Sequence, residues 1–216
     1  MAMMQHSSST RFEANAGIAI GPILFIIAIL AILAAAIAAG SGSFTSGTSS
    51  ESNRTKASAL IQIGENLKVG MDRMLMENGI AYGGYTINAS NTIANNDLFS
   101  PTGGGITSPS DALSNTPGTD HWLYPTGAVP GIGTNNAEQL AILKVAAGVC
   151  DELNNKANGL TSTPGGVDVG DFATTGNDID ISKMNAWPLT GKTIGCVNNT
   201  NGTTNGYYFY QVLYAQ

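Results

Sequence analysis

The strongest constraint on this chain is a long stretch without charge near its N-terminus. No Asp, Glu, Lys or Arg lies between Glu13 and Glu51, and within that stretch Ile18 to Ala39 forms one apolar run of 22 residues. A helix rises about 1.5 Å per residue, so this run reaches about 30 Å, the hydrocarbon thickness of a bilayer. A core helix of a water-soluble domain keeps a polar face. The run therefore predicts a transmembrane helix over 18–39.

Two alternatives remain for the fate of this run. A cleaved secretory signal has a basic start, an apolar core of about 7 to 15 residues and small residues at its cleavage site. Ala36-Ile37-Ala38 supplies the small residues, but the apolar core is longer, and Arg11 and Glu13 cancel each other before it. The length of the run favours a permanent single-pass anchor.

The remainder of the chain is acidic. Glu51 to Gln216 carries 8 basic and 14 acidic residues, which leaves a net charge of −6, and the chain nowhere has two consecutive Lys or Arg residues. Nucleic-acid binding depends on clustered basic side chains, so the composition argues against a nucleic-acid partner. The low charge and the many Gly, Asn, Thr and Ser residues are typical of an extracytoplasmic domain.

The chain has two cysteines, Cys150 and Cys196, 46 residues apart. An even number of cysteines in an exported domain indicates a disulfide, and a bridge over this separation would stabilise the fold by about 3 to 4 kcal/mol. The alternative is a pair of buried free thiols.

The chain divides into four predicted parts. Residues 1–17 form a short tail or leader, 18–39 the transmembrane helix, 40–50 a flexible hinge rich in Gly and Ser, and 51–216 an extracytoplasmic α+β domain.

An amphipathic helix is predicted directly after the hinge. Thr48 and Glu51 match a capping box, and Asn78-Gly79 ends the helical pattern. Apolar residues at spacings of three or four form one stripe, which we expect to pack on the domain: Leu60, Ile63, Leu67, Met71 and Met74.

The C-terminal half predicts a second helix and a hairpin. Two adjacent apolar rows indicate a helix over Ala137 to Ala157, with Asn135 and Glu138 at its start. Lys192 to Val197 and Tyr207 to Tyr214 flank an Asn- and Gly-rich turn and predict a small antiparallel sheet. The predicted fold is therefore α+β, with a loop-rich middle.

Few residues indicate catalysis. The chain has two histidines, His6 and His121, and no Ser in a G-x-S-x-G turn. Asp120 precedes His121, but an isolated histidine beside an aromatic such as Trp122 is more often structural. We therefore expect a protein that is not an enzyme.

One acidic loop has the ligands that calcium prefers. Carboxylate and amide oxygens lie among glycines in a single segment, without the spacing of an EF-hand. The sequence thus offers two interpretations, a solvated loop and a calcium site formed by Asp168, Asp171, Asn177, Asp178 and Asp180.

The order of these parts resembles that of type IV pilin-like proteins, including the pseudopilins of type II secretion. In that family a prepilin peptidase removes a short leader that ends in glycine, which would place processing here between Gly17 and Ile18. The fifth mature residue of the family is usually glutamate, and Pro22 holds that place here.

The resemblance implies a structural role in the inner membrane. Ile18 to Ala39 would anchor the subunit and then pack against related subunits in a pilus or pseudopilus, with the domain in the periplasm or at the cell surface. The alternative is a single-pass anchored or secreted surface-binding domain without enzymatic activity.

Overall fold

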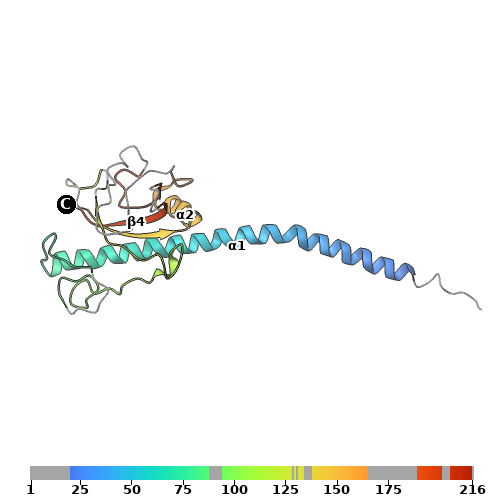
Figure 1. Ribbon diagram of the computed structural model, residues 1–216, viewed down its shortest axis with the longest axis horizontal. Helices are drawn as coiled ribbons and strands as arrows, with labels where there is room; N and C mark the ends of the chain where they lie inside the picture. Colours follow the sequence, from blue (N-terminus) through green and yellow to red (C-terminus); the bar gives the residue numbers. More distant parts are fainter. Residues whose placement is uncertain are drawn as a thin grey trace, which may run out of the picture. The chain divides into compact units, whose positions relative to one another are not determined.

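The computed structural model describes residues 20–87, 94–127, 129, 131–133, 138–164, 189–200 and 205–215; within the first helix it does not describe the side chains of 20–22 and 36–48. The chain divides into two units, Met1–Ser49 and Ser50–Gln216. The helix α1 (Ile20–Glu77) contributes to both units. In its described residues the second unit adds one short 3-10 helix, one α-helix and four strands (Figure 1).

The structure shows no break in α1 at the predicted hinge or at the predicted helix start, Thr48. Gly40 to Gly47 has helical backbone, and α1 continues through it to Glu77. Extending a helix adds one hydrogen bond for each residue, whereas a new helix requires a costly nucleus, and no proline interrupts this stretch. A capping box at Thr48 has no function inside a continuous helix. The flexibility of 40–50 stays a prediction.

Membrane spanning gains no support from the structure. Among the described residues, no helix is both long and apolar enough to cross a bilayer. The transmembrane character of Ile18 to Ala39 thus stays a prediction.

The second unit contains a four-stranded antiparallel sheet in the order β1-β2-β4-β3. Its strands are β1 (Thr126–Gly127), β2 (Glu138–Val145), β3 (Ile194–Asn199) and β4 (Gly206–Tyr214). Cys196 on β3 pairs with Phe209 on β4, so the predicted C-terminal hairpin is confirmed. Together with the helices, the sheet confirms the α+β class.

The predicted helix over Ala137 to Ala157 is wrong in its first half. Residues Glu138–Val145 form β2, and only Ala147–Asn158 form a helix, α2, which ends before Gly159 as expected. Seven of the eight β2 residues are buried, on both faces of the sheet. A strand that is apolar on both faces lacks alternation, so its pattern cannot be distinguished from that of a helix.

Both faces of the sheet are buried in apolar clusters. On one face the predicted stripe of α1 and one side of α2 pack against inward-facing residues of β2 and β4, including Leu143 and Phe209. On the other face Ile142, Tyr210 and Val212 lie in a separate cluster with Leu189. Figure 1 shows the sheet lying along the C-terminal part of α1.

Close packing of the sheet on α1 depends on Gly64. A Cβ at this position would lie 2.9 Å from Gln211 Oε1 and 3.0 Å from Phe209 Cζ, both on β4. The absence of a side chain lets β4 approach the helix backbone. The same β4 residues are almost completely buried.

Candidate functional site

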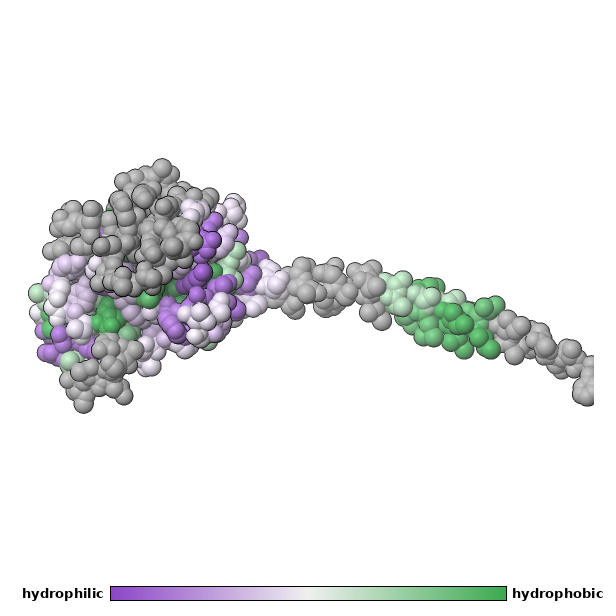
Figure 2. All heavy atoms as spheres, viewed as in Figure 1, coloured by the Kyte–Doolittle hydropathy of each residue, from purple (hydrophilic) through white to green (hydrophobic). Residues whose placement is uncertain are grey.

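The first candidate surface is an apolar segment of α1 in the first unit, Ile23 to Ala35. Every side chain described in this segment is exposed, and the segment has no charged residue. Figure 2 shows it as a uniformly hydrophobic stretch. The large side chains, each 41% to 68% exposed, are Ile23, Leu24, Phe25, Ile26, Ile27, Ile29, Leu30, Ile32 and Leu33.

The exposed side chains of this segment lie on all sides of the helix. Successive helical residues are rotated by about 100°, so consecutive apolar residues cover the full circumference. Monomeric proteins in water rarely expose a continuous apolar surface of this kind, because its hydration is unfavourable. The segment is therefore suited to burial in lipid or against other apolar helices.

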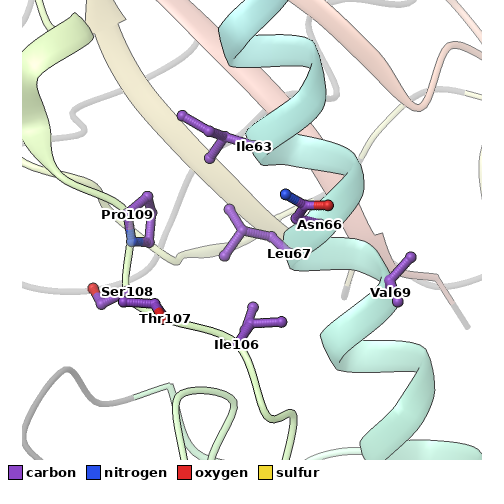
Figure 3. A pocket seen from close by; sticks show the side chains of 8 residues that line it. All are labelled: Ile63, Asn66, Leu67, Val69, Ile106, Thr107, Ser108 and Pro109. Atoms are coloured by element: carbon purple, nitrogen blue, oxygen red, sulfur yellow. The ribbon is translucent and has the colours of Figure 1, made fainter.

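The second candidate surface is a groove in the second unit, between α1 and an extended segment, Ile106 to Pro109. The groove has a volume of about 400 Å³. Figure 3 shows Ile63 and Leu67 reaching from α1 toward the extended segment. Ile106 reaches from that segment back toward α1. The other lining residues are Asn66, Val69, Thr107, Ser108 and Pro109.

One end of the groove is fixed by Gly70. A Cβ at Gly70 would lie 2.8 Å from Cδ1 of Ile106, so the Ile106 side chain is seated directly on the helix backbone. Gly105, immediately before Ile106, has a φ of +70°, a conformation that favours glycine. These two glycines direct the extended segment along α1.

Two intrahelical ion pairs form in the C-terminal part of α1. Lys68 Nζ lies 2.9 Å from Asp72 Oδ2, and Arg73 Nε lies 3.0 Å from Glu77 Oε2. No hydrogen bond to another described residue is made by the backbone N–H groups of Ile106, Thr107 and Ser108. The groove thus offers apolar contacts beside free backbone donors.

His121 has a carboxylate partner, but it is Asp111 and not the neighbouring Asp120. His121 Nδ1 lies 2.7 Å from Asp111 Oδ2, while Asp111 Oδ1 accepts a hydrogen bond from the backbone N–H of Trp122. Asp111 begins the 3-10 helix η1 (Asp111–Leu113). The exposed His121 is therefore held beside the residue that begins η1.

Trp122 is part of the core. Its indole N–H donates to the backbone carbonyl of Ser110, and its ring packs edge-on against Phe209 at a centroid distance of 5.8 Å. The side chain is 8% exposed. It orders the start of the 108–122 loop instead of lining a surface site.

The predicted disulfide is confirmed. Cys150 on α2 and Cys196 on β3 are bridged, with their Cα atoms 5.3 Å apart. The sequence did not indicate the role of Asn154, which lies one turn after Cys150. The Asn154 side chain forms hydrogen bonds with both backbone groups of Cys196. A polar residue in the buried row of a helix was the available signal.

The other predicted sites lie outside the described residues. These are the processing residues Gly17 and Ile18 and the calcium candidates Asp168, Asp171, Asn177, Asp178 and Asp180. In the part of the chain that the structure describes, no three His, Cys, Asp or Glu residues are grouped in a way that could hold a metal ion. Both hypotheses stay predictions.

Comparison with protein-family models, with curated proteins and with solved structures finds no match to this chain.

Proposed function

We propose that this chain is a structural, non-enzymatic subunit that is anchored in a membrane and assembles through its N-terminal apolar helix, in the manner of pilin-like proteins. The observation that carries the proposal is the exposed segment from Ile23 to Ala35. Burying one large apolar side chain of this kind is worth about 1.5 to 3 kcal/mol, so nine of them strongly favour lipid or helix partners over water.

The second unit supports a role outside the cytoplasm. The Cys150–Cys196 disulfide is typical of an oxidising compartment. The domain that it stabilises includes the C-terminal part of α1, held by a buried stripe that contains Leu60, Leu67 and Met71.

The test starts from the full chain expressed in a bacterium with a prepilin peptidase. Membranes are washed with alkaline carbonate, and the retained protein is examined by mass spectrometry of its N-terminus and by electron microscopy after shearing from the cells. Retention, a mature N-terminus at Ile18 and filaments are the expected results. Complete release by carbonate contradicts the anchor, and an intact N-terminus contradicts pilin-like processing.

A second candidate is a surface-binding domain carried by the same anchor or secreted. The groove along α1 favours it, because Ile63, Leu67 and Ile106 form an apolar wall beside free backbone N–H groups. Such a groove suits an extended peptide that supplies apolar side chains and backbone carbonyls. A mature N-terminus near Ala39 together with a monomer in solution would favour this candidate over the subunit.

A further inference from the structure

The outer edge of β3 is occupied by side chains of α2. Among the described residues, which give the sheet order β1-β2-β4-β3, β3 has a paired neighbour on one side only. Asn154 donates from Nδ2 to the carbonyl of Cys196 and accepts at Oδ1 from the N–H of Cys196, both at 2.9 Å. Asn158 Nδ2 donates to the carbonyl of Ile194 at 3.0 Å. Two side-chain amides thus replace the backbone of a further strand.

The register shows that these are the outward groups of β3. In an antiparallel pair, residues alternate between those that bond to the neighbouring strand and those that point away from it. Val212 on β4 donates to the carbonyl of Thr193, which places the odd-numbered residues of β3 toward β4. The groups of Ile194 and Cys196 therefore face outward, as do those of Asn198.

The sequence of β3 does not protect its edge. Its sequence, Ile194 to Asn199, contains no charged residue and no proline. Natural edge strands avoid sheet-to-sheet association by such residues, by bulges or by a covering element. Here the covering element is α2, which the disulfide attaches to the middle of β3.

We propose that α2 is an edge cover, and that β3 is a latent self-association surface whose occupant, once the cover is lost, is β3 of a second copy. Two antiparallel copies of this strand present the same outward N–H and C=O groups to each other, as a two-fold interface requires. The inference does not depend on the role of the apolar segment.

The first test uses the full wild-type chain in detergent micelles. Amide hydrogen exchange should show the N–H of Cys196 protected far more strongly than that of Asn198, because only Cys196 is bonded to α2. Equally fast exchange at both amides overturns the edge cover without any mutation.

The second test removes the hydrogen bonds of the cover, while the disulfide remains. In the variant Asn154→Ala with Asn158→Ala, both hydrogen bonds to the backbone of Cys196 and the one to the carbonyl of Ile194 are gone. Its mass by light scattering should rise by about twofold over the wild type as the concentration increases, since the strand pairs with a second copy. The single variant Asn158→Ala keeps the experiment informative if the double variant fails to fold, and it should associate more weakly.

A blocking substitution separates strand pairing from general exposure of apolar surface. The N–H of Asn198 faces outward, so Asn198→Pro removes an edge donor without a loss of hydrogen bonding to β4. Added to either variant, it should return the mass to the wild-type value. Association that persists with Asn198→Pro overturns the proposal, as does a folded double variant that keeps the wild-type mass.

Discussion

The side chain of Asn154 makes both hydrogen bonds that the backbone of Cys196 requires, each at 2.9 Å and each buried. Cys196 is at the same time bridged to Cys150, one helical turn before Asn154. The helix α2 is therefore joined to β3 by one covalent bond and two hydrogen bonds at the same residue. This arrangement fixes the register between a helix and a strand that are distant in sequence.

Replacing Asn154 by leucine should destabilise the second unit by about 2 to 6 kcal/mol, because two buried backbone groups lose their partners at about 1 to 3 kcal/mol each. Urea unfolding of the oxidised protein measures the change. The matched control is Asn155→Leu, one residue along and exposed, which should change stability by less than about 0.5 kcal/mol. Equal effects of the two substitutions would contradict a specific role for Asn154.

Removing the disulfide should lower stability by about 4 kcal/mol on the chain-entropy estimate for a separation of 46 residues. The variant is Cys150→Ala with Cys196→Ala, compared with the wild type by urea unfolding. Treatment of the unfolded wild type with iodoacetamide, without reductant, should leave both cysteines unlabelled. Labelling of either cysteine would show that the bridge is absent.

The parts of the fold that could be predicted are those with one buried face. The stripe through Leu60, Leu67 and Met71 alternates with charged residues, and the helix it predicted is present. The strand Glu138–Val145 was predicted as a helix because its partners cover both of its faces. The pairing of β2 with β4 is a tertiary interaction, so the local sequence pattern of Glu138–Val145 does not indicate it.

The candidate sites divide in a similar way. The apolar segment and the disulfide are properties of residue type and count, so the sequence indicated them. The groove does not follow from residue type or count. It forms because Ile106, 36 residues further along the chain, packs on Gly70. The partner of His121 was likewise hidden, since Asp111 reaches it through a turn and the adjacent Asp120 does not.

Gly64→Ala should destabilise the protein by about 1 to 3 kcal/mol, despite the better helix propensity of alanine, because the new methyl group would press on Phe209 and Gln211 of β4. Thermal unfolding measures the effect. Gly70→Ala should destabilise the protein as well, because its new methyl group would lie 2.8 to 3.1 Å from three side-chain carbons of Ile106. A Gly64→Ala variant as stable as the wild type would show that β4 is free to move away from α1.

Alkaline unfolding should involve Tyr85. Burial, with smaller contributions from the neighbouring Tyr82 and Tyr214, raises the pKa of Tyr85 from 10.0 to about 12. Because the folded pKa is above the unfolded one, this tyrosine contributes full stability below pH 10, and the contribution is lost as the pH rises toward 12. Tyr85→Phe should therefore flatten the fall in melting temperature between pH 10 and 12. An unchanged fall in this variant would assign the alkaline sensitivity to other groups.

The exposed apolar segment gives the most direct test of the proposed anchor. Ile29 lies near the middle of Ile23 to Ala35, and arginine at the centre of a membrane helix costs about 2.5 to 3.5 kcal/mol on the insertion scale. Ile29→Arg should therefore shift the partition between membrane and soluble fractions by about a hundredfold toward the soluble fraction, while Ile29→Leu stays at the wild-type value. Circular dichroism and an intact Cys150–Cys196 bridge control for the folding of the second unit. If the arginine variant is folded and remains in the membrane fraction as completely as the leucine variant, burial of this segment is not what holds the protein there.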